Sequence, residues 1–241
     1  PSPPDELFPP QVVRILDALD EDRPRESELV EALQELQDLH EYDRQWAIWP
    51  ARVAHVRRSS YNRGLFQLLR GVLRCVDRAA GGVQMAAVDL FYSLCVGGCN
   101  LTRVPLTFAV ECGAIGVLSK AARKEPDETI LRVLVEISRK APAEILPSLI
   151  DQGAIEAATQ TIEEAGSSPM EQLAALELIL SLAKRAPART AKSGAYDAVK
   201  AVSNEALVSR RNKIMNFLRP LLEQEAGRRA ATNIRIGGLK F

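Results

Sequence analysis

Apolar residues in this chain recur at spacings of three and four over most of its length. Ile155, Ala158 and Ile162 follow this spacing, and the apolar residues of residues 169–185 cover more than half of a helix circumference. Such a wide apolar face is typical of a helix that is packed between neighbours on two sides. Runs of alternating β-branched residues do not occur before the extreme C-terminus. The pattern therefore predicts an all-α fold.

A glycine followed by alanine and a larger side chain returns at a nearly fixed interval. The three copies begin at Gly113, Gly153 and Gly194, which are 40 and 41 residues apart. Glycine tolerates the left-handed conformation that closes a helix, so each copy predicts the end of one helix and the start of the next. A period of about 40 residues indicates stacked helical repeats, in which each unit buries its apolar face against the next.

One unit is predicted to contain three helices, over about residues 143–150, then from residue 154, and over residues 169–185. The third helices of two successive units end in the same pattern, two basic residues followed by alanine and proline. The two copies are Arg139-Lys140-Ala141-Pro142 and Lys184-Arg185-Ala186-Pro187. Three helices in about 40 residues, with Gly-Ala-Ile opening the second, resemble armadillo repeats. The resemblance covers roughly residues 61–224. It implies a right-handed α-solenoid of about four repeats, with an N-terminal helical cap, extended tails and third helices that line a concave groove.

Breaks in the pattern divide the chain into four segments. Residues 1–10 form a proline-rich arm, and residues 11–57 form two amphipathic helices that cap the first repeat. A protein-binding arm is the alternative for this pair of helices. Residues 58–225 are the armadillo-like repeat domain, and residues 226–241 are a basic, extended tail.

The tail carries an unusual pattern. Residues 232–236 alternate between polar and apolar side chains, and Leu239 and Phe241 place two apolar side chains at the end. One interpretation is a disordered tail. The other is an anchor in which Arg235, Leu239 and Phe241 contact a partner protein.

Charge is segregated along the chain, although the formal net charge is zero. Residues 1–45 carry a net charge of −9, and residues 46–80 carry +6. Within the basic block, one side of a predicted helix forms a basic ridge, opposite the leucine and valine face; the ridge consists of Arg63, Arg70, Arg74 and Arg78. The ridge is either a solvated face that also pairs with the acidic N-terminal helices or a docking site for an acidic protein surface. Nucleic acid is not favoured, because no exposed aromatic residues interleave the arginines.

The armadillo resemblance implies groove positions near the middle of each third helix and four residues later. In this chain those positions are Asp89 and Ser93, Arg132 and Glu136, and Glu177 and Ser181. In the family they are often Trp and Asn, and neither occurs here. This departure counts against binding of an extended basic peptide of the nuclear-import kind. The groove is predicted either to bind a mixed-charge peptide or helix or to be a solvated wall.

Catalytic and metal-binding patterns were not found. The four cysteines, Cys75, Cys95, Cys99 and Cys112, do not have the spacing of a zinc site, and the two histidines are distant from them in sequence. Free buried thiols and a reducing compartment are expected. Motifs of a phosphate-binding loop or an activated nucleophile are also lacking. We therefore predict no enzyme activity, no cofactor and no small-molecule substrate.

Two functional hypotheses follow from these observations. In the first, the chain is a structural or accessory subunit of a multi-subunit assembly, held by its charged faces and its termini. In the second, it is a transient adaptor that binds a linear motif in the groove. Both expect other proteins as partners and no membrane span. The missing initial Met is compatible with removal of a transit peptide or with a boundary inside a longer protein, so the compartment is predicted to be cytosolic or organellar.

Overall fold

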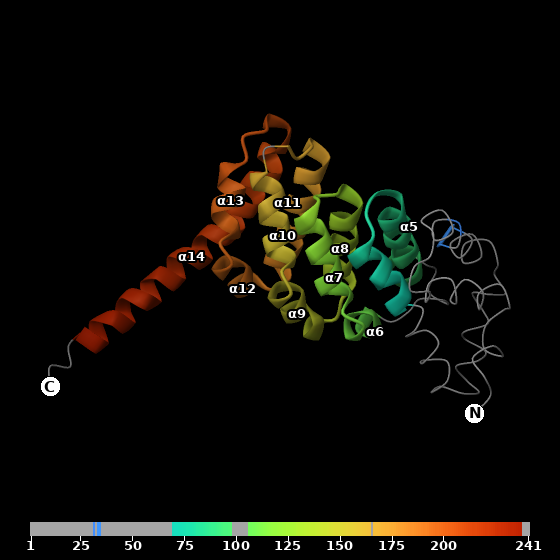
Figure 1. Ribbon diagram of the computed structural model, residues 1–241. Helices are drawn as coiled ribbons and strands as arrows, with labels where there is room; N and C mark the ends of the chain where they lie inside the picture. The colour runs from blue at the N-terminus through green and yellow to red at the C-terminus, as the bar shows by residue number, and fades with distance from the viewer. Residues whose placement is uncertain (1–30, 32, 35–68, 98–105, 165, 238–241) are drawn as a thin grey trace, which may run out of the picture. The chain divides into compact units, whose positions relative to one another are not determined.

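The computed structural model describes residues 31, 33–34, 69–97, 106–164 and 166–237. All regular elements in these ranges are helices (Figure 1). In chain order they are a helix at residues 69–78, α5 (Gly81–Tyr92), a π-helix (Ser93–Gly97), α6 (Leu106–Glu111), α7 (Ala114–Lys124), α8 (Glu128–Lys140), a 3₁₀-helix (Ala143–Ile145), α9 (Leu146–Asp151), α10 (Ala154–Glu163), α11 (Pro169–Arg185), α12 (Pro187–Lys192), α13 (Ala195–Ala201), a 3₁₀-helix (Glu205–Leu207) and α14 (Val208–Gly237).

The chain divides into two compact units, residues 1–121 and residues 122–241. In the first unit, the helix at residues 69–78 buries Leu69, Val72 and Val76, as the sequence predicts. Gln84 of α5 is also buried, and its Nε2 donates a hydrogen bond to the carbonyl oxygen of Val76 at 2.8 Å. A buried amide with a partner avoids the cost of an unsatisfied polar group.

The second unit contains α8 followed by two three-helix repeats, α9–α10–α11 and α12–α13–α14. Helix α11 contacts α8, α10 and α14, so it has neighbours on several sides (Figure 1). This packing confirms the prediction from its wide apolar face, and its bounds match the predicted 169–185. Its buried residues are Ala174, Ala175, Leu176, Leu178, Ile179, Leu180, Ser181, Leu182 and Ala183.

Side-chain caps explain where the third helices begin. The carboxylate of Asp127 accepts hydrogen bonds from the backbone N–H groups of Thr129 and Ile130 at the start of α8. Ser168 and Glu171 form a capping box at the start of α11, in which the side chain of each accepts a hydrogen bond from the backbone N–H of the other. Such caps satisfy donors that have no partner inside the helix, and each contributes about 0.5–2 kcal/mol.

The three repeated glycines have the conformation that the sequence predicts. Gly113, Gly153 and Gly194 adopt φ angles of +85°, +90° and +79°. A Cβ added at Gly153 would lie 2.7 Å from Nη1 of Arg123, at the tip of a flexible side chain that can move aside. The positive φ angles are therefore the feature that favours glycine at these positions.

The C-terminal tail differs from the prediction of an extended segment over residues 226–241. Helix α14 continues to Gly237, through Pro220, and in Figure 1 it runs on past the other helices of its unit. The alternation at residues 232–236 is too short to decide the conformation. A helix that is already formed gains one hydrogen bond for each residue added, and the arginines and alanines of residues 228–231 favour it.

Several predicted features lie outside the described residues. These are the proline-rich arm, nearly all of the N-terminal cap, residues 98–105, and residues 238–241. Leu33, within the segment predicted as two amphipathic cap helices, is described and is fully buried.

Candidate functional site

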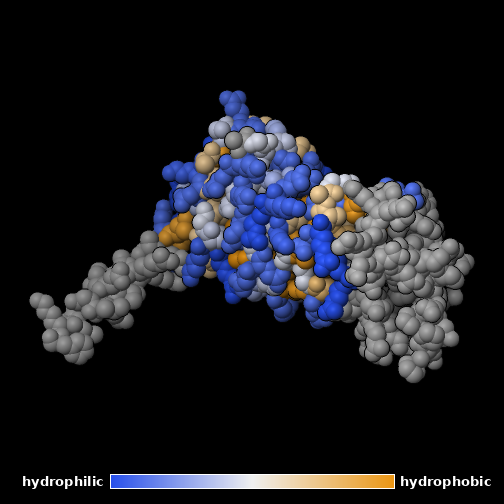
Figure 2. Space-filling model, viewed as in Figure 1, coloured by the Kyte–Doolittle hydropathy of each residue, from blue (hydrophilic) through white to orange (hydrophobic). Residues whose placement is uncertain are grey.

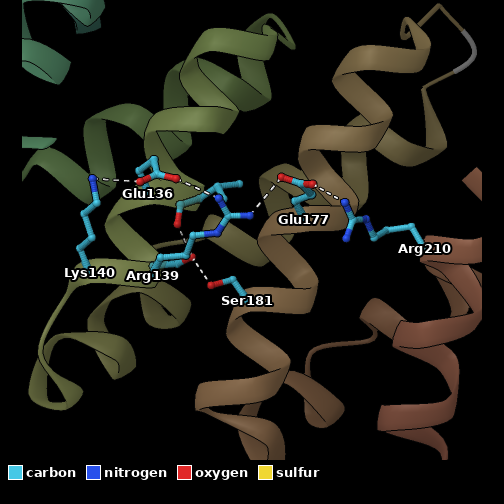
Figure 3. Close-up of polar contacts among 8 residues, drawn as sticks. Glu136, Arg139, Lys140, Glu177, Ser181 and Arg210 are labelled. Carbon is cyan, nitrogen blue, oxygen red and sulfur yellow. Dashed lines mark hydrogen bonds and ion pairs between the residues drawn. The ribbon is translucent and has the colours of Figure 1, made fainter. Parts of the chain in front are cut away.

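Five side chains of alternating charge link α8, α11 and α14, and we call them the charge ladder (Figure 3). Glu136 on α8 contacts Nζ of Lys140 at 3.0 Å and Nη1 of Arg139 at 2.9 Å. Arg139 also reaches Glu177 on α11 through Nη2 at 3.2 Å. The other oxygen of Glu177 accepts a hydrogen bond from Nη2 of Arg210 on α14 at 2.7 Å. The ladder therefore joins three third helices.

Helical spacing explains the part of the ladder within α8. Arg139 and Lys140 follow Glu136 by three and four residues, which places all three side chains on one face. Burial tends to raise the pKa of Glu136, but the hydrogen bonds and positive charges of Lys140 and Arg139 outweigh it and lower the pKa. Glu136 is therefore ionised at neutral pH.

A pocket of about 240 Å³ lies beside the ladder in the second unit. Four of its lining side chains are cationic and one is a carboxylate; the lining consists of Arg139, Glu177, Leu180, Ser181, Lys184, Arg185 and Arg210. The four cations and one carboxylate leave a formal excess of three positive charges. The pocket is therefore electrostatically suited to an anion.

Two of the pocket's cations have no carboxylate partner among the described residues. Arg185 donates to two carbonyl oxygens at the C-terminal end of α8, those of Ser138 and Ala141, the second at 2.6 Å. These oxygens carry only the partial negative charge of a helix terminus. Lys184 is exposed, and its ammonium group makes no hydrogen bond or ion pair within the described part of the chain.

The predicted groove residues differ in their contacts and in their exposure. Glu136 and Glu177 belong to the charge ladder. Arg132 instead pairs with Glu128 on its own helix and is exposed. Ser181 lines the pocket but is only 9% exposed, and its Oγ lies 2.7 Å from Oγ of Ser138, so its main contact is between repeats. The remaining pair belongs to the first unit, where Asp89 on α5 is exposed and Ser93 is half-buried.

The other predicted contact residues are partly described. Arg70, Arg74 and Arg78 are exposed on the helix at residues 69–78, as expected for a ridge, and Arg63 lies outside the described residues. Their role in binding stays a prediction. Of the tail residues, Arg235 is within α14, whereas Leu239 and Phe241 lie outside the described residues.

The cysteines that the structure describes are free thiols. Cys75 and Cys95 are buried, and Cys112 is half-buried. Burial raises the pKa of Cys75 against the opposing charge of Arg74, and it raises the pKa of Cys112 against that of Arg70. Raised pKa values keep these two thiols protonated and therefore weakly nucleophilic. Among the described residues, no cluster of three His, Cys, Asp or Glu side chains is arranged to hold a metal ion.

Sequence reasoning missed the basic side chains of the charge ladder and the pocket. Arg139, Lys140, Lys184 and Arg185 were interpreted only as the repeated stop of the third helices. That repetition is the signal that could have found them, because equivalent positions of stacked repeats lie side by side. Arg210 had no such signal.

Comparison with solved structures identifies the fold. A designed armadillo repeat protein has a TM-score of 0.54 with this chain at 16% sequence identity, and the match covers 85% of this chain and 98% of the designed one. The fold is thus an all-α solenoid with armadillo-like repeats. Comparison with protein-family models and with curated protein sequences gives no match. In the described part of the chain, every helix is too short or too polar to cross a bilayer.

Proposed function

We propose that this chain is a non-enzymatic adaptor that binds a segment of a partner protein across α8, α11 and α14. The observation that carries this proposal is the basic pocket beside the charge ladder. It lies on third helices, the elements expected to line the groove of an armadillo-like repeat. A partner segment with negative charge gains electrostatic attraction there.

The polarity of the described surface favours reversible binding. Large apolar side chains that are exposed in the described residues include Met170 at 44% and Phe217 at 40%, and neither lines the pocket. Hydrophilic residues cover most of the coloured surface in the view of Figure 2. Obligate interfaces are larger and more hydrophobic, whereas transient ones are comparatively polar.

Charge reversal at the pocket tests the proposal. Wild-type protein and a Lys184→Glu/Arg210→Glu variant are each used to isolate partners from an extract of the source cells, with proteins identified by mass spectrometry. Lys200→Glu is the matched control, because Lys200 is also exposed on a helix of this unit but does not line the pocket. We expect the double variant to recover at least tenfold less of the partner proteins that the wild type and the control recover. Equal recovery by all three proteins would exclude this face as the binding surface.

A stable subunit of a larger assembly is the second candidate. The observation in its favour is the opposed charge of residues 1–45 and 46–80, at −9 and +6. Charge blocks of this size steer and orient association. Under this candidate, the endogenous protein migrates in a large assembly on native gels, and truncation before Gln11 or after Gln224 releases it. Migration as a free monomer favours the adaptor instead.

A further inference from the structure

We propose that the pocket of Arg139, Lys184, Arg185 and Arg210 binds a phosphate monoester on a phosphorylated side chain of the partner segment. This inference rests on the proposed function and specifies the chemistry of the partner.

The charge balance of the pocket favours a dianion. Glu177 is the one carboxylate in the lining, and it is already shared by two guanidinium groups, those of Arg139 and Arg210. The excess of three positive charges is reduced to two by a carboxylate and to about one by a phosphate monoester, which carries about −1.5 to −2 at neutral pH. A phosphate therefore gains more from this pocket than a glutamate or aspartate side chain does.

The lining also has hydrogen-bond donors that remain available to a ligand. A guanidinium group has five N–H donors. Two nitrogens of Arg185 donate to the carbonyl oxygens of Ser138 and Ala141, and one nitrogen of Arg210 donates to Glu177. Lys184 adds three donors that make no hydrogen bond or ion pair within the described part of the chain. Phosphate oxygens match the paired donors of arginine, and such charge-assisted bonds are about twice as strong as neutral ones.

The size of the pocket points to a group on a larger molecule. Pockets that enclose a whole small-molecule ligand have volumes of about 300–1,000 Å³, whereas this one measures about 240 Å³. A phosphorylated side chain fills such a pocket while its peptide backbone lies across the helices. A nucleic acid is disfavoured, because the cations gather at one pocket, and acidic side chains such as Glu136 and Glu128 lie along the same helix α8.

Peptide libraries with one fixed central residue test the phosphate directly. Three libraries differ only in that residue, which is phosphoserine, serine or glutamate, and binding is measured by fluorescence polarisation. We expect the phosphoserine library to bind at least tenfold more tightly than the glutamate library, and the serine library to show no binding. Binding should weaken from about pH 7.5 to about pH 5.5, because the second pKa of a phosphate ester is about 6. Equal binding of the phosphoserine and glutamate libraries would overturn the proposal.

Variants with opposite expected effects on binding distinguish phosphate recognition from a structural role of these residues. Lys184→Gln and Arg210→Gln should each weaken binding of the phosphoserine library by about fivefold or more, whereas Lys200→Gln leaves it unchanged. Glu177→Gln should tighten binding severalfold, because it removes the negative charge and releases two guanidinium groups. A purely structural role for Glu177 predicts weaker binding of Glu177→Gln, which would contradict the proposal.

Two further arms identify the source of the phosphate and separate the two proposals. Binding of inorganic phosphate as tight as that of the phosphoserine library would mean a small-ion site and would overturn the inference. The partners isolated from cell extract should also be lost after phosphatase treatment. If they survive phosphatase but are lost with Lys184→Glu/Arg210→Glu, the phosphate proposal fails and the adaptor function stands. If they survive both, the adaptor function fails as well.

Discussion

Ser138 on α8 and Ser181 on α11 make a buried hydrogen bond between consecutive repeats, and their replacement by alanine tests how the third helices are held together. Their Oγ atoms are 2.7 Å apart, and Oγ of Ser138 is also 2.7 Å from the carbonyl oxygen of Val135. Each hydroxyl has a single proton to donate. If Ser138 donates to Val135, then Ser181 donates to Ser138.

This arrangement predicts unequal costs for the two substitutions. Ser181→Ala leaves Ser138 with its bond to Val135, so the loss is that of one neutral hydrogen bond, about 0.5–1.5 kcal/mol. Ser138→Ala leaves the hydroxyl of Ser181, which is 9% exposed, without its partner, and a stranded buried polar group costs about 1–3 kcal/mol. Removing both hydroxyls strands neither group. We therefore expect the double variant to lose about 1 kcal/mol, less than the sum of the single losses.

The assay is urea unfolding of the wild type, both single variants and the double variant, followed by circular dichroism. The cycle gives a coupling free energy, which we expect to be about 1–2 kcal/mol. A coupling below about 0.3 kcal/mol would refute the reasoning, because the two hydroxyls would then act independently. The result also distinguishes two roles of Ser181, contact with a partner protein and contact between repeats, because a residue that only contacts a partner shows no such coupling.

Two further predictions concern a glycine turn and the charge ladder. Gly153→Ala and Gly113→Ala should each lower the free energy of unfolding by about 1–3 kcal/mol, because both positions have positive φ and the tip of the Arg123 side chain beside Gly153 can move aside. Adding Arg123→Ala should leave the cost of Gly153→Ala unchanged, and a smaller cost would mean that the arginine contact, rather than the backbone conformation, causes the loss. The pKa of Glu136 is lowered in the folded state, so its contribution is fully present above its unfolded pKa and is lost as pH falls through its folded pKa. From about pH 7 to about pH 3, wild type should lose more stability than Glu136→Gln in urea unfolding, and parallel pH profiles would contradict this.

The sequence by itself determined the helices and the repeat. Local signals fix their ends, since a cap, a proline or a left-handed glycine acts within a few residues of its own position. The bounds of α11 and the positive φ angles of the three repeated glycines therefore follow from sequence alone. The wide apolar face of α11 likewise predicted neighbours on several sides, because apolar area that large must be buried.

The tertiary structure decided which polar side chains meet. Arg139 and Glu177 are 38 residues apart, and Glu177 and Arg210 are 33 apart. Whether such residues touch depends on how stacked helices cross and on which rotamer each side chain adopts, and neither is written in the local pattern. For the same reason Ser181 was expected on the groove surface but turns toward Ser138. The basic pocket forms in the same way. Its basic residues lie at the C-terminal ends of α8 and α11 and at the start of α14, and the sequence pattern alone identified those of α8 and α11 only as signals that end a helix.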